Sequence, residues 1–135
     1  WGPAGGRFGE LAGPGASRVH FIQTYVFTEH NNARGDALLA SLKAAYPQIK
    51  SLADVTPAVG IANAYDALHL SALAIEKAGN TDGKAVRDGF YAITDYDGLI
   101  KHYTQPFTAQ KHDALGPDDY VFTHFEGDQI VPLKP

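Results

Sequence analysis

The segment that most constrains the fold is residues 19–27 (VHFIQTYVF), which have apolar or aromatic side chains on both faces of a possible β-strand. Alternate side chains of a strand point to opposite faces of its sheet. One face would carry Val19, Phe21, Gln23, Tyr25 and Phe27. The other would carry His20, Ile22, Thr24 and Val26. A strand of this kind is typical of an α/β sheet that is covered on both sides.

Apolar residues recur at helical spacing in later segments, which predicts helices over residues 33–46, 61–78 and 82–93. The helix over residues 61–78 has the strongest pattern, with one stripe formed by Ile61, Tyr65, Leu68, Ala72 and Ile75. Thr81 is placed to cap the third helix. A further short helix is expected at residues 7–12, after a glycine-rich opening loop.

The remaining segments predict short strands and a loop. Residues 98–103 favour a short strand, and residues 104–117 contain two prolines without a clear period, which indicates a loop. Residues 120–125 and 129–133 predict two strands joined by a turn at residues 126–128.

The composition excludes several classes of function. A length of 135 residues with 44% hydrophobic residues is enough for one domain with a core. The net charge of −4 gives no support to nucleic-acid binding or to an anionic membrane surface. No apolar run approaches the roughly 20 residues of a membrane span, since the longest contains His69 and Ser71. Without cysteine there are no disulfides or thiolate sites.

The start of the chain suggests that it is a piece of something longer. It begins at Trp1 and contains no methionine, so Trp1 is not a translation start. A secretion signal in front of it would leave no trace in this sequence.

Motifs for catalysis, metal binding and phosphate binding are all incomplete. The glycines of the opening loop lack the lysine and hydroxyl residue of a phosphate loop and the spacing of a dinucleotide site. The histidines show no metal-ligand spacing, and residues 95–98 (DYDG) lack the later ligands of a calcium loop. Ser41 and Ser71 fall inside predicted helices, where a nucleophile is poorly presented. We therefore expect neither an enzyme nor a metal or cofactor site.

Aromatic residues are the remaining indication of function. Trp1, Tyr25, Phe27 and Tyr65 fall at strand ends, at the glycine loop and near a helix start. These are places where open α/β sheets bind ligands. The alternative is that Tyr25 and Tyr65 simply belong to the core. The residues alone favour part of an α/β binding domain.

An ordered set of segments resembles one known family. The main match is residues 61–70 (IANAYDALHL) followed by residues 74–79 (AIEKAG). Further matches, in the same order as in the family, are residues 1–6, 21–27, 81–88, 96–100 and 120–132. Together they resemble the last third of the branched-chain amino acid type substrate-binding proteins of bacterial ABC transporters, the type I periplasmic binding proteins.

The resemblance implies an incomplete version of a two-lobe fold with Rossmann-like, three-layer α/β/α lobes. Residues 1–27 and 117–135 would belong to the second lobe and residues 28–116 to the first. Neither sheet would be complete within this chain. We therefore expect it to pair with a missing N-terminal part or to swap elements with a second copy.

The family also implies a function and a site. The expected function is ligand capture between two lobes by hinge closure, followed by delivery to an ABC permease, in the periplasm or outside the cell. The ligand would be a small amino-acid-like molecule, amide or aromatic acid. The alternative is a ligand-sensing regulatory domain of the same fold. The positions that match the family's ligand-facing residues are Trp1, Gly2, Phe27, Thr28, Asn63 and Tyr65.

Overall fold

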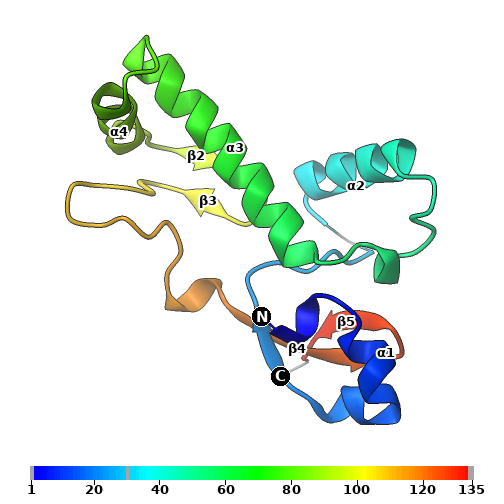
Figure 1. Ribbon diagram of the computed structural model, residues 1–135. Coiled ribbons are helices and arrows are strands. Elements are labelled where there is room, and N and C mark those ends of the chain that lie inside the picture. Colours follow the sequence, from blue (N-terminus) through cyan, green and yellow to red (C-terminus); the bar gives the residue numbers. More distant parts are fainter. Residues whose placement is uncertain (1, 30, 134–135) are drawn as a thin grey trace. The chain divides into compact units, whose positions relative to one another are not determined.

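The computed structural model describes residues 2–29 and 31–133 (Figure 1). These residues form two units, each considered separately below. Unit 1 consists of Trp1–Ala62 and Tyr120–Pro135, and unit 2 consists of Asn63–Asp119. The predicted division into lobes at residues 27 and 116 stays a prediction.

Unit 1 contains an antiparallel three-stranded sheet in the order β1-β4-β5. The strands are β1 (Phe21–Gln23), β4 (Val121–Glu126) and β5 (Gln129–Pro132). The predicted C-terminal hairpin is confirmed, and its turn contains Gly127 in the left-handed region, at φ 60°. In contrast, β1 is much shorter than the strand predicted over residues 19–27.

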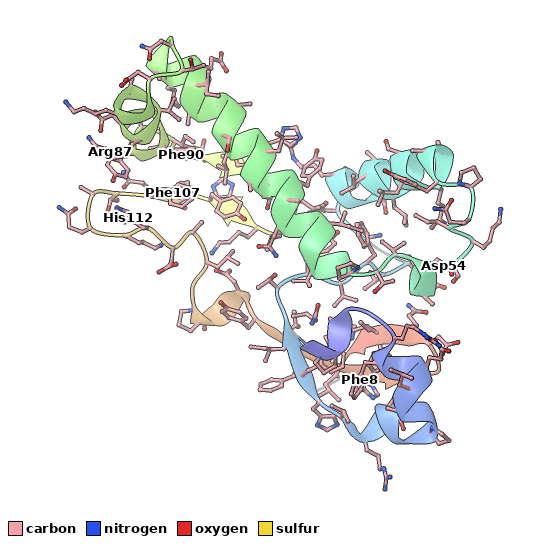
Figure 2. All side chains as sticks on the ribbon, viewed as in Figure 1. Phe8, Asp54, Arg87, Phe90, Phe107 and His112 are labelled. Atoms are coloured by element: carbon pink, nitrogen blue, oxygen red, sulfur yellow. The ribbon has the colours of Figure 1, made fainter. Side chains whose placement is uncertain are left out.

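One face of this sheet is covered by the N-terminal segment, made of η1 (Gly2–Ala4), α1 (Phe8–Ala12) and η2 (Gly13–Arg18). The core consists of Ala4, Ala16, Phe21, Val59 and Phe125. Phe8, labelled in Figure 2, stacks on Phe125 with 5.8 Å between ring centroids. Aromatic burial of this kind fixes α1 on the sheet.

The opposite face of the sheet is exposed within the described part of the chain. Ile22 and Phe122 lie directly across from each other on β1 and β4 and are 40% and 63% exposed. The expectation of a strand covered on both faces is therefore wrong for the described residues, because the chain supplies covering elements on one side only.

Unit 1 also contains α2 (Ala33–Ala45) and η3 (Leu52–Asp54). Asn32 caps α2 by accepting a hydrogen bond from the Gly35 amide at 2.8 Å. Ser51 and Asp54 form a capping box at η3. The helix predicted over residues 33–46 is confirmed to within one residue.

Unit 2 is built on the long helix α3 (Ala58–Ala78), whose first five residues belong to unit 1. Beside it lie α4 (Gly83–Tyr91) and a hairpin of β2 (Tyr96–Asp97) and β3 (His102–Tyr103) (Figure 1). A short turn of helix, η4 (Pro117–Asp119), ends the unit. The helix cap differs from the prediction, because Asp82 rather than Thr81 accepts the first amides of α4.

The core of unit 2 contains Leu70, Ala74 and Ile93. Phe90 and Phe107, both labelled in Figure 2, meet edge to face at 5.4 Å beside it. By length and composition α3 is apolar enough to cross a membrane, contrary to the expectation from sequence. Within the described structure 28% of this apolar stretch is buried, and Leu70 and Ala74 are the residues of α3 in the core of unit 2.

A buried carboxylate anchors the β2–β3 hairpin to α3. Asp66 is 2% exposed and accepts hydrogen bonds from the backbone amides of Leu99 (2.6 Å) and Ile100 (2.9 Å). It also accepts one from the Tyr103 hydroxyl at 2.9 Å. The single strand predicted over residues 98–103 is wrong, because residues 98–101 form the turn that Asp66 binds.

Candidate ligand-binding site

Unit 1 contains a partly open cavity of about 380 Å³, within the size range of small-molecule sites. Four segments of the chain line it: the loop into α1, the end of β1 with the residues after it, the stretch around η3, and the β4–β5 hairpin. Their lining residues are Pro3, Ala4, Gly6, Arg7, Gly9, Glu10, Gln23, Tyr25, Val26, Phe27, Leu52, Ala53, Val55, Thr56, Ala58, Phe125, Asp128 and Ile130.

The buried lining residues include two phenylalanines and one side-chain amide. Phe27 is 2% exposed, Phe125 is buried, and Gln23 is 1% exposed. Tyr25 meets Phe27 edge to face, with 5.0 Å between centroids. A flat apolar body could pack against these rings.

The side-chain carboxamide of Gln23 offers a hydrogen-bond acceptor among these buried lining residues. Its nitrogen donates to the backbone carbonyl of Ile22 at 2.8 Å. Its oxygen accepts no hydrogen bond from the residues that the structure describes. Because the nitrogen is fixed by its own bond, the oxygen is the atom of Gln23 that is available to a ligand.

The outer lining residues are charged and exposed. Arg7 and Glu10 form an ion pair, which raises the pKa of the Arg7 guanidinium and lowers the pKa of the Glu10 carboxyl. Asp128 adds a second carboxylate. Thr56 donates from its hydroxyl to the carbonyl oxygen of Ala4 at 3.2 Å. The described lining residues therefore carry one positive formal charge, on Arg7, and two negative ones, on Glu10 and Asp128.

No protein-family profile and no curated protein sequence matches the chain. Among solved structures, a periplasmic binding protein type 1 from Bordetella pertussis Tohama I is similar over 96% of the chain, with a TM-score of 0.73 and 25% sequence identity. The chain shares the fold of part of a type 1 periplasmic binding protein. An extracellular ligand-binding receptor from Rhodopseudomonas palustris is similar over 94% of the chain, with a TM-score of 0.63 and 19% identity.

The chain spans 37% of each of these two structures. This coverage is consistent with the predicted C-terminal portion of a two-lobe type I fold. The predicted fold class, α/β and incomplete in this chain, is confirmed. Both similar proteins are described as binding proteins or receptors.

The residues predicted from the type 1 resemblance are divided between the units. Phe27 lines the cavity, whereas the exposed Gly2, in η1, is not among its lining residues. Thr28 lines a second hollow of about 440 Å³, and its backbone amide donates to Asn31 Oδ1 at 2.9 Å. Trp1 lies outside the described residues.

Asn63 and Tyr65 lie on α3 in unit 2, where the Tyr65 ring is 4.3 Å from that of His69. Their role as ligand contacts, like that of the other predicted residues, stays a prediction. Among the described residues, no group of three or more His, Asp or Glu side chains is placed to hold a metal ion.

Sequence reasoning missed Gln23, Arg7, Glu10 and Thr56 as cavity residues. Gln23 carried a usable signal, because it is the one polar residue on the apolar face formed by Val19, Phe21, Tyr25 and Phe27. The other three come from loops and helix starts, where polar residues are ordinary and give no such signal.

Proposed function

We propose that this chain is the C-terminal portion of the solute-binding component of an ABC importer. The observation that carries the proposal is the similarity over 96% of the chain to a type 1 periplasmic binding protein. The cavity in unit 1 supports it, because aromatic walls with a few polar groups are typical of small-molecule sites. Reversible capture requires no catalytic group, which agrees with the incomplete catalytic motifs.

In this proposal residues 1–27 and 117–135 belong to the second lobe and residues 28–116 to the first. The ligand, an amino-acid-like molecule or a small aromatic acid, is held when the lobes close by a hinge motion. Trp1, Gly2, Phe27, Thr28, Asn63 and Tyr65 contact it. The protein is exported, and a membrane permease receives the ligand.

The chain supplies only part of such a protein, so the proposal includes pairing with an N-terminal part or with a second copy. Ile22 and Phe122, exposed cross-strand partners on the open sheet face, support this because adjacent exposed apolar side chains favour an interaction surface.

An NMR titration of the ¹⁵N-labelled chain tests ligand capture. The probes are a mixture of amino acids and, separately, a set of small aromatic acids. We expect saturable shifts in the amides of residues 3–10, 23–27 and 52–58, which line the cavity. Residues 83–91 of α4 lie in unit 2 and serve as the internal control. A folded chain whose cavity amides respond to none of the probes would contradict the proposal.

A further inference from the structure

We propose that the cavity in unit 1 selects a ligand that brings a hydrogen-bond donor, an N–H or an O–H, to the side-chain carbonyl oxygen of the buried residue Gln23. The ligand class is a small molecule with a flat apolar body and a neutral or cationic donor group at its inner end. The inference rests on the proposed solute-binding function and adds to it the chemistry of the recognised group and a specificity-determining residue.

The first argument is the unused acceptor of Gln23. The side chain is 99% buried, its nitrogen is held by the Ile22 carbonyl, and its oxygen accepts nothing from the described residues. A ligand that fills the cavity removes this oxygen from water. A ligand donor at this position replaces the lost hydrogen bond, whereas a purely apolar group leaves the oxygen unpaired.

The second argument excludes a carboxylate as the group that reaches Gln23. Two acceptors, the carbonyl oxygen of Gln23 and a ligand carboxylate, cannot hydrogen-bond to each other. Arg7 is the one cationic side chain among the described lining residues, and it is exposed and already paired with Glu10. The carboxylates of Glu10 and Asp128 further disfavour an anion entering the cavity.

The third argument concerns the body of the ligand. Tyr25, Phe27 and Phe125 line the same cavity as Gln23. Rings packed edge to face or offset contribute beyond simple burial. A cavity of about 380 Å³ admits a single substituted ring together with its donor group.

Three probes with one ring test the inference: phenol, anisole and benzoate. Methylation in anisole removes the donor of phenol and keeps the oxygen, and benzoate replaces the donor with an anion. We expect phenol to bind about three- to tenfold more tightly than anisole, the usual effect of one hydrogen bond. Benzoate should bind most weakly, so of the two proposed ligand classes the inference favours amino-acid-like molecules, whose ammonium group is a donor, over small aromatic acids. Affinities come from NMR titration of the ¹⁵N-labelled chain.

The variant Gln23→Leu replaces the carboxamide with an apolar side chain and removes the acceptor. In this variant phenol and anisole should bind with about equal affinity, because only the hydrogen bond to Gln23 distinguishes the two probes. Gln110→Leu, on the exposed loop of unit 2, is the matched control and should keep the preference. If Gln23→Leu fails to fold, the side-chain carboxamide of Gln23 in the unchanged protein provides the test, since phenol but not anisole should shift its resonances.

The outcomes separate the two proposals. If anisole or benzoate binds in the cavity as tightly as phenol, the inference is wrong while the solute-binding proposal stands. If phenol is preferred and Gln23→Leu keeps that preference, another group supplies the acceptor and the inference is also wrong. If none of the probes, amino acids or aromatic acids shifts the cavity amides, both proposals fail.

Discussion

The carboxylate of Asp66 should dominate the stability of unit 2. It is buried and accepts three hydrogen bonds, with the Leu99 amide on Oδ1 and the Ile100 amide and Tyr103 hydroxyl on Oδ2. Hydrogen bonds to a charged group contribute ~1.5–3 kcal/mol each. Asp66→Asn has one acceptor oxygen instead of two, so at least one donor loses its partner and faces an N–H group.

We therefore expect Asp66→Asn to lower the free energy of unfolding by about 2–3 kcal/mol, and Asp66→Ala by about 4 kcal/mol. Urea denaturation measures the change. Amide hydrogen exchange at Leu99 and Ile100 shows whether the hairpin is released first, because those two amides lose their acceptor directly.

The matched control is Asp88→Asn on α4. Asp88 is exposed and pairs with Arg87 at the surface, so its loss should change the free energy of unfolding by less than about 0.5 kcal/mol. If Asp66→Asn is as stable as this control, with unchanged exchange at Leu99, the carboxylate does not hold the hairpin and the reasoning is refuted.

Three other perturbations test separate features. Gly89→Ala should destabilise unit 2 by about 2 kcal/mol or more in thermal denaturation, because its Cβ would lie 2.2 Å from the Ala74 carbonyl oxygen. Gly83→Ala meets open space and should be neutral or stabilising; equal effects of the two substitutions would contradict the packing argument. The hydrogen bond to Asp97 raises the pKa of His102, so its stabilisation of the hairpin is complete below the unfolded value of 6.5 and is lost as the pH rises through the folded value. Amide hydrogen exchange of the β2–β3 hairpin, measured over a pH series and corrected for intrinsic rates, should show protection falling as the pH rises in the unchanged chain. The variant His102→Gln should not show this fall. Phe122→Ser, on the exposed sheet face, should reduce self-association in size-exclusion chromatography, and an unchanged elution volume would argue against that face as the contact.

Local sequence patterns were sufficient to predict the helices and the β4–β5 hairpin. The apolar spacing over residues 61–78 predicted the helix, and α3 extends only three residues further at its start. The predicted stripe is not its buried face, because Leu68 and Ile75 are 71% and 40% exposed whereas Leu70 and Ala74 are buried. The turn chemistry around Gly127 predicted the β4–β5 hairpin for a similarly local reason. The β2–β3 hairpin was missed because it depends on a distant residue, Asp66, that lies 33 positions before Leu99.

The difference between local and long-range contacts also limits how much of the site can be predicted from the sequence. Phe27 was selected for its place at a strand end, and it lines the cavity. Arg7 and Thr56 line the cavity from segments about 50 residues apart, and the sequence of neither segment predicts that the two meet. Their meeting follows from the packing of η1 and Val59 against one face of the β1–β4 sheet, which is a tertiary event.

The sequence pattern alone does not decide whether a polar residue on an apolar face serves the fold or binds a ligand, and two residues illustrate this. Asp66 lies beside the stripe of α3, and Gln23 lies on the apolar face of β1; both are almost fully buried. Asp66 finds three donors within the chain, so its polarity is explained by the fold. Gln23 satisfies its nitrogen locally, its oxygen accepts no hydrogen bond from the described residues, and the residue lines a cavity with aromatic walls. A ligand that fills this cavity removes the oxygen from water, so the partner that we propose for it comes from outside the chain.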